Sequence, residues 1–212
     1  LFERLRVSAT MTKLLFGVDV IADIRLHYWD FVTLLFKKVL KKYVMPSQKV
    51  LEIGTGENAI LSISLIKSTD ILLTAVDKVP EIVVNAKKSM SRNKVSFDLR
   101  LSDIFSNCNG PFDIIFWNLP YVPTSCGISA KSDRVTDDAL WDGGFDGAVL
   151  IRRFINEAPP FLMKNGKILV GINTFYVPYA EVEKIIEESS FRLEKAVSSW
   201  WNPSKVFVLT LK

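Results

Sequence analysis

Apolar and polar positions along this chain follow two alternating patterns. Short apolar runs predict buried strands at 49–53, 71–77, 95–103, 112–117 and 166–172. Between and around them, apolar residues recur at helical spacing at 27–43, 58–67, 80–93, 147–162 and 180–189. The chain ends with two further strand patterns, 191–201 and 204–212, joined by "NPS", which is typical of a hairpin.

The order of these elements predicts an α/β fold. Alternation of strands and helices with short connections indicates a parallel sheet covered by helices on both faces, with right-handed crossovers. The expected architecture is a Rossmann-like, seven-stranded sheet that ends in an antiparallel hairpin. We expect an N-terminal helical segment at 1–45 that packs on a main domain at 46–212. The long segment 118–145 exceeds ordinary connection lengths, which indicates a functional loop.

Composition narrows the chemistry. The 212 residues carry 27 Lys plus Arg against 23 Asp plus Glu, a net charge of +4 that permits a nucleic-acid partner without requiring one. Two cysteines and one histidine argue against a disulfide framework, a zinc site and a histidine-based triad. The apolar runs are too short to cross a membrane. We therefore expect a cytoplasmic protein.

Glycine and polar residues gather where the predicted strands end. The turn 52–58, "EIGTGEN", follows the first strand, and Asp77, Asp103 and Asn118 end three others. Ligands of parallel α/β sheets bind at the carboxyl ends of the strands, so this edge of the sheet is the expected binding site.

Each of these residues has a functional and an ordinary interpretation. Gly54 and Gly56 permit close approach of a ligand, or they simply form a tight strand-to-helix turn. Asp77 is placed to accept both hydroxyls of a ribose, or it caps the helix that opens at Pro80. Asp103 could accept from an adenine amino group, or it is a turn residue.

These motifs resemble those of class I S-adenosylmethionine-dependent methyltransferases across roughly residues 48–212. "VLEIGTG" is similar to their first motif, "AVD" to the second and "SDIF" to the third. Asn58 stands where a glycine is usual. The resemblance implies S-adenosyl-L-methionine as the cofactor. The cofactor-binding residues it implies are Glu52, Gly54, Thr55, Gly56, Asp77, Lys78, Asp103, Ile104 and Asn118.

The stretch 118–121, "NLPY", resembles the Asn-Pro-Pro-Tyr motif of members that methylate a planar nitrogen. Such a nitrogen is a poor nucleophile because its lone pair is delocalised, so it needs orientation more than a strong base. The Asn118 side-chain oxygen and the Leu119 carbonyl can each accept one N–H. Pro120 restricts the turn, and Tyr121 can stack on the flat acceptor. An ordinary strand-terminal turn is the alternative.

The acceptor is left open between two classes. "GGFDG" at 143–147 is similar to the HemK-like protein-glutamine methyltransferases, which implies a glutamine side chain of a translation termination factor and, for short members, a small activating protein partner. The literal "NLPY" is similar to ribosomal RNA adenine dimethyltransferases, and guanine N2 methyltransferases share a related motif. Lysines at 37–42 would suit RNA phosphate, or they form a solvated helix face. A catalytically silent binding protein is the alternative of another class.

Overall fold

The computed structural model describes residues 2–21, 28–127, 139–200 and 202–212. The single histidine, His27, and the middle of the long loop lie outside these residues. The strands are β1 (Lys49–Ile53), β2 (Leu72–Asp77), β3 (Asp98–Leu101), β4 (Phe112–Asn118), β5 (Leu162–Asn173), β6 (Phe191–Ser198) and β7 (Ser204–Leu211). The helices are α1 (Phe2–Arg6), α2 (Ala9–Phe16), α3 (Phe31–Tyr43), α4 (Ile60–Ser68), α5 (Pro80–Asn93), α6 (Thr124–Gly127), α8 (Val149–Glu157), the 3-10 turn η2 (Pro159–Phe161) and α9 (Tyr179–Glu187).

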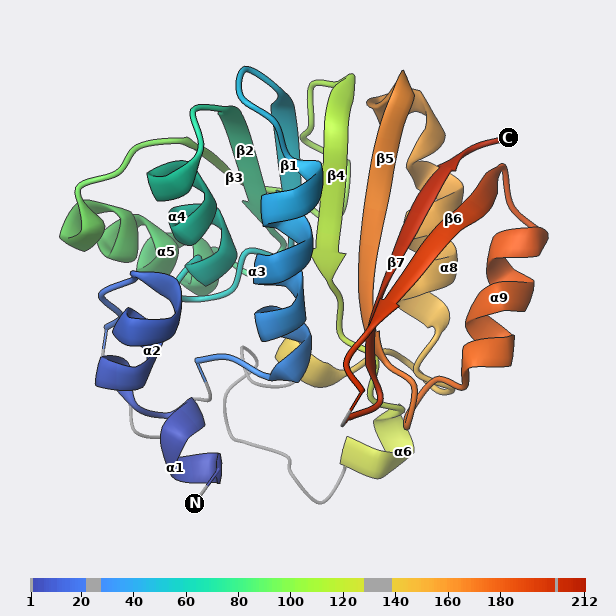
Figure 1. Ribbon diagram of the computed structural model, residues 1–212, viewed down its shortest axis with the longest axis horizontal. Coiled ribbons are helices and arrows are strands. Elements are labelled where there is room, and N and C mark those ends of the chain that lie inside the picture. The colour runs from blue at the N-terminus through green and yellow to red at the C-terminus, as the bar shows by residue number, and fades with distance from the viewer. Residues whose placement is uncertain (1, 22–27, 128–138, 201) are drawn as a thin grey trace.

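The strands form one seven-stranded sheet in the order β3-β2-β1-β4-β5-β7-β6 (Figure 1). Strands β1 to β5 pair in parallel, and β7 lies antiparallel to both β5 and β6. The predicted α/β architecture with its closing hairpin is therefore confirmed. Because β1 and β4 are central neighbours, the turn after β1 and the turn after β4 open at the same edge of the sheet.

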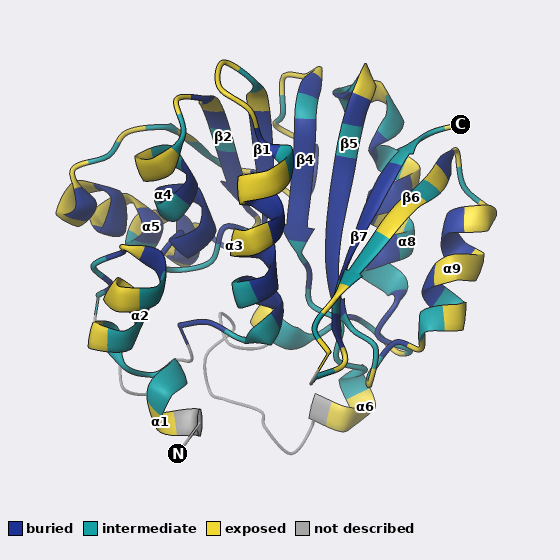
Figure 2. Ribbon diagram, in the orientation of Figure 1, coloured by how far each residue is buried: buried dark blue, intermediate teal, exposed yellow. Residues whose placement is uncertain are grey.

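Two apolar layers hold the sheet between its helices. Successive residues of one strand alternate between them: Val50 belongs to the layer under α2, α3 and α4, and Leu51 to the layer under α8 and α9. Figure 2 shows the central strands buried along their lengths, whereas the helices are buried on one side only. Burial of both faces explains why these strands appear in the sequence as continuous apolar runs.

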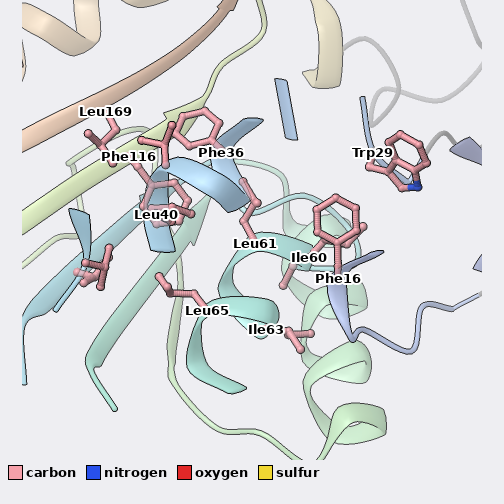
Figure 3. Packing of buried hydrophobic residues seen from close by; sticks show 14 of the residues in the cluster. Phe16, Trp29, Phe36, Leu40, Ile60, Leu61, Ile63, Leu65, Phe116 and Leu169 are labelled. Atoms are coloured by element: carbon pink, nitrogen blue, oxygen red, sulfur yellow. The ribbon is translucent and has the colours of Figure 1, made fainter. Parts of the chain in front are cut away.

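Helix α3 lies unusually close to the sheet because of a glycine. A Cβ atom at Gly171 of β5 would sit 2.1 Å from Phe36 Cε2 and 2.5 Å from Val32 Cγ1. Phe36 then packs on Phe116 of β4, with ring centroids 5.8 Å apart, and beside Leu169 (Figure 3). Gly171 pairs with Asn118 in the sheet register, so the N-terminal turn of α3 is held directly over the end of β4.

Several predicted boundaries were wrong, each for a local reason. The helix expected at 27–43 begins at Phe31, because the Asp30 side chain caps it by accepting from Thr33 N. The strand expected at 95–103 covers only Asp98–Leu101, since Val95 N still donates to Met90 O at the end of α5. The helix expected at 147–162 ends at Glu157, before Pro159, and β5 starts at Leu162 rather than at 166.

No helix in the part of the chain that the structure describes combines the length and apolarity needed to cross a bilayer.

Candidate active site

The turn between β1 and α4 adopts backbone conformations that favour glycine. Gly54 and Gly56 have φ values of 65° and 68°. A Cβ at Gly54 would also lie 2.5 Å from Trp117 Nε1, whereas one at Gly56 would meet nothing within 4 Å. A side chain at position 54 is thus excluded both by contact with Trp117 and by the backbone conformation. At position 56 only the backbone conformation favours glycine, and the space beside the turn is open.

Asp77 ties the end of β2 to this turn. Its two oxygens accept from Gly56 N at 3.2 Å and from Val79 N at 3.1 Å. Burial raises the pKa of the Asp77 carboxyl, and the bonds from the main-chain N–H groups of Val79 and Gly56 oppose that rise. Val79, not Asp77, is the N-cap of α5, and no side chain caps that helix, so the capping interpretation of Asp77 is wrong. Asp77 instead bonds the turn and lines a cavity.

A smaller cavity of about 190 Å³ collects the residues of the second and third motifs. Its walls include Gly54, Asp77, Lys78, Asp103 and Ile104. Ile104 is buried and has a φ of 48°, an uncommon conformation for a branched side chain. Asp103 is exposed.

The Asp103 carboxylate has a partner that the sequence did not reveal. Arg153 of α8 reaches it with Nη1 2.8 Å from Asp103 Oδ2 and also bonds Glu157. Arg153 lines the smaller cavity as well. An ion pair between α8 and the end of β3 therefore borders the smaller cavity.

A larger cavity of about 720 Å³ lies on the other side of the glycine turn. Glu52 and Thr55 form part of its wall, and Thr55 Oγ1 lies 3.4 Å from Glu52 Oε2. Ser62 also donates to Glu52 Oε2. Burial raises the pKa of Glu52 to about 8, while the bonds from Ser62 and Thr55 oppose that rise and the nearby Asp77 adds to it.

The last residue of β4, Asn118, lines the larger cavity together with Pro120 and Tyr121, which follow the strand. Asn118 and Pro120 also border the smaller cavity. Asn118 Nδ2 donates to Thr33 Oγ1 at 3.2 Å. Asn118 Oδ1 is buried and, among the described residues, has no hydrogen-bond donor. A buried amide oxygen without a donor is costly, so this atom is an acceptor that a group entering the cavities can satisfy.

Leu119 takes a different position from its neighbours. Its side chain is only 2% exposed and belongs to the apolar layer under α8, and it lines neither cavity. The Leu119 side chain therefore anchors the turn by packing in the core. The role expected for its carbonyl stays a prediction.

The glycines at 143–147 allow the returning loop to pack on the main chain of Tyr121. Val122 N donates to Trp141 O at 3.0 Å, and Gly143 N donates to Val122 O at 2.9 Å. A Cβ at Gly147 would lie 2.5 Å from Tyr121 O, and one at Gly143 would lie 2.8 Å from Tyr121 Cα. Trp141 lines the larger cavity. Residues 140 and 141 of this loop therefore form part of the wall of the larger cavity.

Sequence reasoning missed Asp30 and Thr33, which line the larger cavity and contact the "NLPY" turn. Asp30 Oδ2 accepts from the Tyr121 hydroxyl at 2.8 Å. The available signal was an Asp followed three residues later by Thr at the start of an apolar helix, which we had included inside the helix.

Asn58 also acquires a role. Its Oδ1 accepts from Ile21 N at 2.9 Å and from Ser89 Oγ at 3.0 Å. The residue that replaces a usual glycine thus ties the segment before α3 to the glycine turn and to α5.

These features define a class of protein. A seven-stranded sheet of this order, with a glycine turn after β1 and acidic residues after β2 and β3, is the fold of S-adenosylmethionine-dependent methyltransferases. Residues 27–136 match the family model described as "Methyltransferase small domain". The chain belongs to the methyltransferase small domain family.

Individual relatives agree with this assignment. The chain is 38% identical over 133 residues to a putative protein N5-glutamine methyltransferase of Methanocaldococcus jannaschii, covering 62% of this chain and 66% of that protein. A methyltransferase structure from Pyrococcus furiosus superposes with a TM-score of 0.73 at 20% identity, covering 100% of this chain and 96% of that one. A T. thermophilus 16S rRNA N2 G1207 methyltransferase in complex with AdoMet and guanosine gives 0.61 at 20% identity, covering 87% and 44%.

At 20% identity, the two solved structures show the likeness of fold alone. The matches cover from 33% to 66% of the length of the first curated relatives.

Proposed function

We propose that this protein is an S-adenosyl-L-methionine-dependent N-methyltransferase that acts on a planar amide or amino nitrogen. The observation that carries the proposal is the orphaned Oδ1 of Asn118, which is buried at the junction of the two cavities. A hydrogen-bond acceptor in that position suits an incoming N–H group. The family of the chain and its relatives support the same reaction class.

The residues present fit the cofactor. Gly56 leaves open space beside the turn, Asp77 supplies a buried carboxylate for ribose hydroxyls, and Ile104 supplies an apolar wall for a purine. We assign the nucleoside part to the smaller cavity and the amino-acid part to the larger one, near Glu52 and Thr55. The bound cofactor would supply a methyl group made electrophilic by a sulfonium. Asp103 and Lys78 complete the proposed binding set, with Arg153 holding the Asp103 carboxylate.

The chain itself would orient the acceptor. Asn118 Oδ1 would accept one N–H of the substrate, and the Leu119 carbonyl is the proposed acceptor for the other. Tyr121 would lie against the flat group, while Pro120 and the 143–147 loop hold the turn in place. Such positioning accounts for about 7–11 kcal/mol of a barrier in favourable cases. No strong base is needed, because the proton can leave after the nitrogen has reacted.

A glutamine side chain of a protein is the acceptor that the site supports best, and a translation termination factor is the proposed substrate. Within the described residues, the wall of the larger cavity has the acidic residues Asp30 and Glu57 against Arg6, while Glu52 keeps its proton at neutral pH. This balance does not favour a phosphate backbone. The lysines at 37, 38, 41 and 42 lie in the middle and the last turn of α3, and the first turn next to Asp30 has none. Helix α3 is labelled in Figure 1. The name of the M. jannaschii relative points the same way.

The competing acceptor is an RNA base, adenine N6 or guanine N2. It is supported by the name of a relative from Haemophilus influenzae, "Ribosomal RNA small subunit methyltransferase C", which is 28% identical over 134 residues. A small activating protein partner, implied by the resemblance to short HemK-like members, stays a prediction.

Transfer of a labelled methyl group from S-adenosylmethionine into cell extract tests the proposal. We expect label in polypeptide, removed by protease and resistant to RNase. Asn118→Ala should lower turnover by about a hundredfold or more while the cofactor still binds. Asn165→Ala, an exposed position at the opposite end of β5, is the matched control and should leave turnover unchanged.

Three outcomes contradict parts of the proposal. Unchanged turnover of Asn118→Ala refutes the role of the amide. Label in RNA selects the base as acceptor. Absence of heat on titration with S-adenosylmethionine and with its demethylated product would identify a silent binding protein instead of an enzyme.

A further inference from the structure

The hydroxyl of Thr33 lies at the centre of a hydrogen-bond chain between α3 and Asn118. Thr33 Oγ1 is 2.6 Å from Asp30 Oδ1 and 3.2 Å from Asn118 Nδ2, and Asp30 N donates to it at 3.2 Å. A hydroxyl has one proton to donate, and here the carboxylate takes it. The Thr33 oxygen can therefore only accept from Asn118.

The direction of this hydrogen bond fixes the orientation of the Asn118 amide, whose oxygen and NH₂ group could otherwise exchange places by a 180° rotation. Because Thr33 presents an acceptor, the Asn118 NH₂ group must face α3, and Oδ1 must face away from it. That oxygen is the orphaned atom between the two cavities. The acceptor oxygen of the site is thus set by a residue that lies 85 positions earlier in the chain.

The same carboxylate also holds the aromatic residue of the turn. Asp30 Oδ2 accepts from the Tyr121 hydroxyl at 2.8 Å, while Asp30 Oδ1 accepts from both Thr33 N and Thr33 Oγ1. Burial and the neighbouring Asp30 carboxylate raise the pKa of Tyr121 well above its usual value, so the phenol stays a donor. Tyr121 also lies against Tyr176, with ring centroids 6.0 Å apart. Asp30, the N-cap of α3, therefore contacts both the Tyr121 hydroxyl and the Thr33 hydroxyl that meets the amide.

The position of α3 makes these contacts stable. Val32 and Phe36, on either side of Thr33, pack against Gly171, which pairs with Asn118 in the sheet. Thr33 is itself 7% exposed. The first turn of α3 and the last residue of β4 are consequently held together by packing as well as by hydrogen bonds.

We propose that Asp30 and Thr33 are positioning residues of the acceptor site: the Asp30 carboxylate sets the proton of Thr33, and Thr33 turns the Asn118 oxygen toward the substrate while Asp30 holds the Tyr121 ring. This inference rests on the proposed N-methyltransferase function. An ordinary helix cap explains the bond from Thr33 N to Asp30, but it gives no reason for the contacts with Asn118 and Tyr121.

The test replaces Thr33 by two residues of similar size. Thr33→Val keeps the shape and removes the hydroxyl, and Thr33→Ser keeps the hydroxyl. The first measurement needs no activity: the Asn118 side-chain NH₂ signals are recorded by NMR in ¹⁵N-labelled protein without cofactor and are assigned with Asn118→Ala. We expect them to move in Thr33→Val and to stay near their wild-type positions in Thr33→Ser.

The second measurement is kinetic. Thr33→Val should lower kcat by about tenfold to a hundredfold, with the dissociation constant of the demethylated cofactor product changed less than about twofold, and Thr33→Ser should restore most of the rate. Thermal unfolding of both variants shows whether the fold is kept. If Thr33 only capped the helix, Thr33→Val would lower the unfolding temperature, and it would not lower kcat while leaving the affinity for the cofactor product unchanged.

Unmoved Asn118 signals in Thr33→Val, or equal kcat in the two folded variants, would overturn the positioning role and leave the proposed function intact. A wild-type protein that methylates neither polypeptide nor RNA would instead refute the proposed function, and with it the catalytic meaning of the pair. If Thr33→Val does not fold, Tyr121→Phe and Asp30→Asn test the other branch, and unchanged turnover in both overturns the inference.

Discussion

Replacing Glu52 by Gln should make the folded protein more stable in alkaline solution. Glu52 is 3% exposed, and burial raises its pKa from 4.5 to about 8. Between these values the carboxyl of the folded protein keeps its proton, whereas the carboxyl of the unfolded chain has lost it. The unfolded state then binds fewer protons, so stability falls as the pH rises through this window.

The magnitude follows from the width of the window. Each pH unit between the two pKa values is worth about 1.4 kcal/mol, so the whole interval from 4.5 to about 8 carries roughly 5 kcal/mol. Glutamine imitates the protonated acid, because it is uncharged and its side-chain oxygen can still accept from the Ser62 and Thr55 hydroxyls. Glu52→Gln lacks this loss of stability at rising pH. The two proteins should therefore be about equally stable near pH 5, and above pH 8 the variant should be more stable by several kcal/mol, ~5 at most.

Urea unfolding at intervals from pH 5 to pH 9, without cofactor, measures the effect. Urea carries no charge and leaves the electrostatics unscreened. Glu183→Gln, an exposed carboxylate on α9, is the control and should follow the wild-type curve. Some pH dependence will remain in Glu52→Gln, since burial raises the pKa of Asp77 as well. If the wild-type and Glu52→Gln curves run parallel across the whole range, Glu52 is ionised in the folded protein and the reasoning is wrong.

Two further predictions concern the glycine turn and the packing of α3 against Gly171. Asp77→Ala should weaken binding of the demethylated cofactor product by about tenfold to a hundredfold, the loss expected for hydrogen bonds to a charged group, and calorimetry that finds wild-type affinity would contradict our placement of the ribose. Gly171→Ala should destabilise the fold by about 1–3 kcal/mol through overpacking against Phe36 and Val32. Gly17→Ala, where only the left-handed backbone is strained, is its comparison and should cost about 1–2 kcal/mol without loss of activity. A Gly171→Ala protein with wild-type turnover would show that the close packing of α3 on the sheet is not needed for activity.

The elements of the sheet were predictable because each is marked by a short local pattern of residues. Apolar runs such as 49–53 mark strands that are buried on both faces, and Pro80 marks the start of α5. The glycine turn, Asp77 and Asn118 were found because the carboxyl ends of parallel strands meet at one edge. The structure brings these three features to the two adjoining cavities.

The contacts between α3 and the "NLPY" turn were not predictable in the same way. Helical periodicity gives the face of α3 that is buried, but not how deeply the helix sits or which hydroxyl meets Asn118. That depends on Gly171, a residue that looks in the sequence like any small residue within a strand. The bond from Arg153 to Asp103 likewise joins residues 50 positions apart, through a geometry that no local pattern records.

The leucine at position 119 has a thermodynamic consequence. A proline in its place would restrict the chain whether folded or unfolded, because its ring fixes the backbone covalently. Leu119 restricts the turn only while its side chain remains inside the apolar layer that it shares with Phe154 and Ile151. Loosening of the hydrophobic interior around Leu119 would therefore also release one of the restraints on the "NLPY" turn.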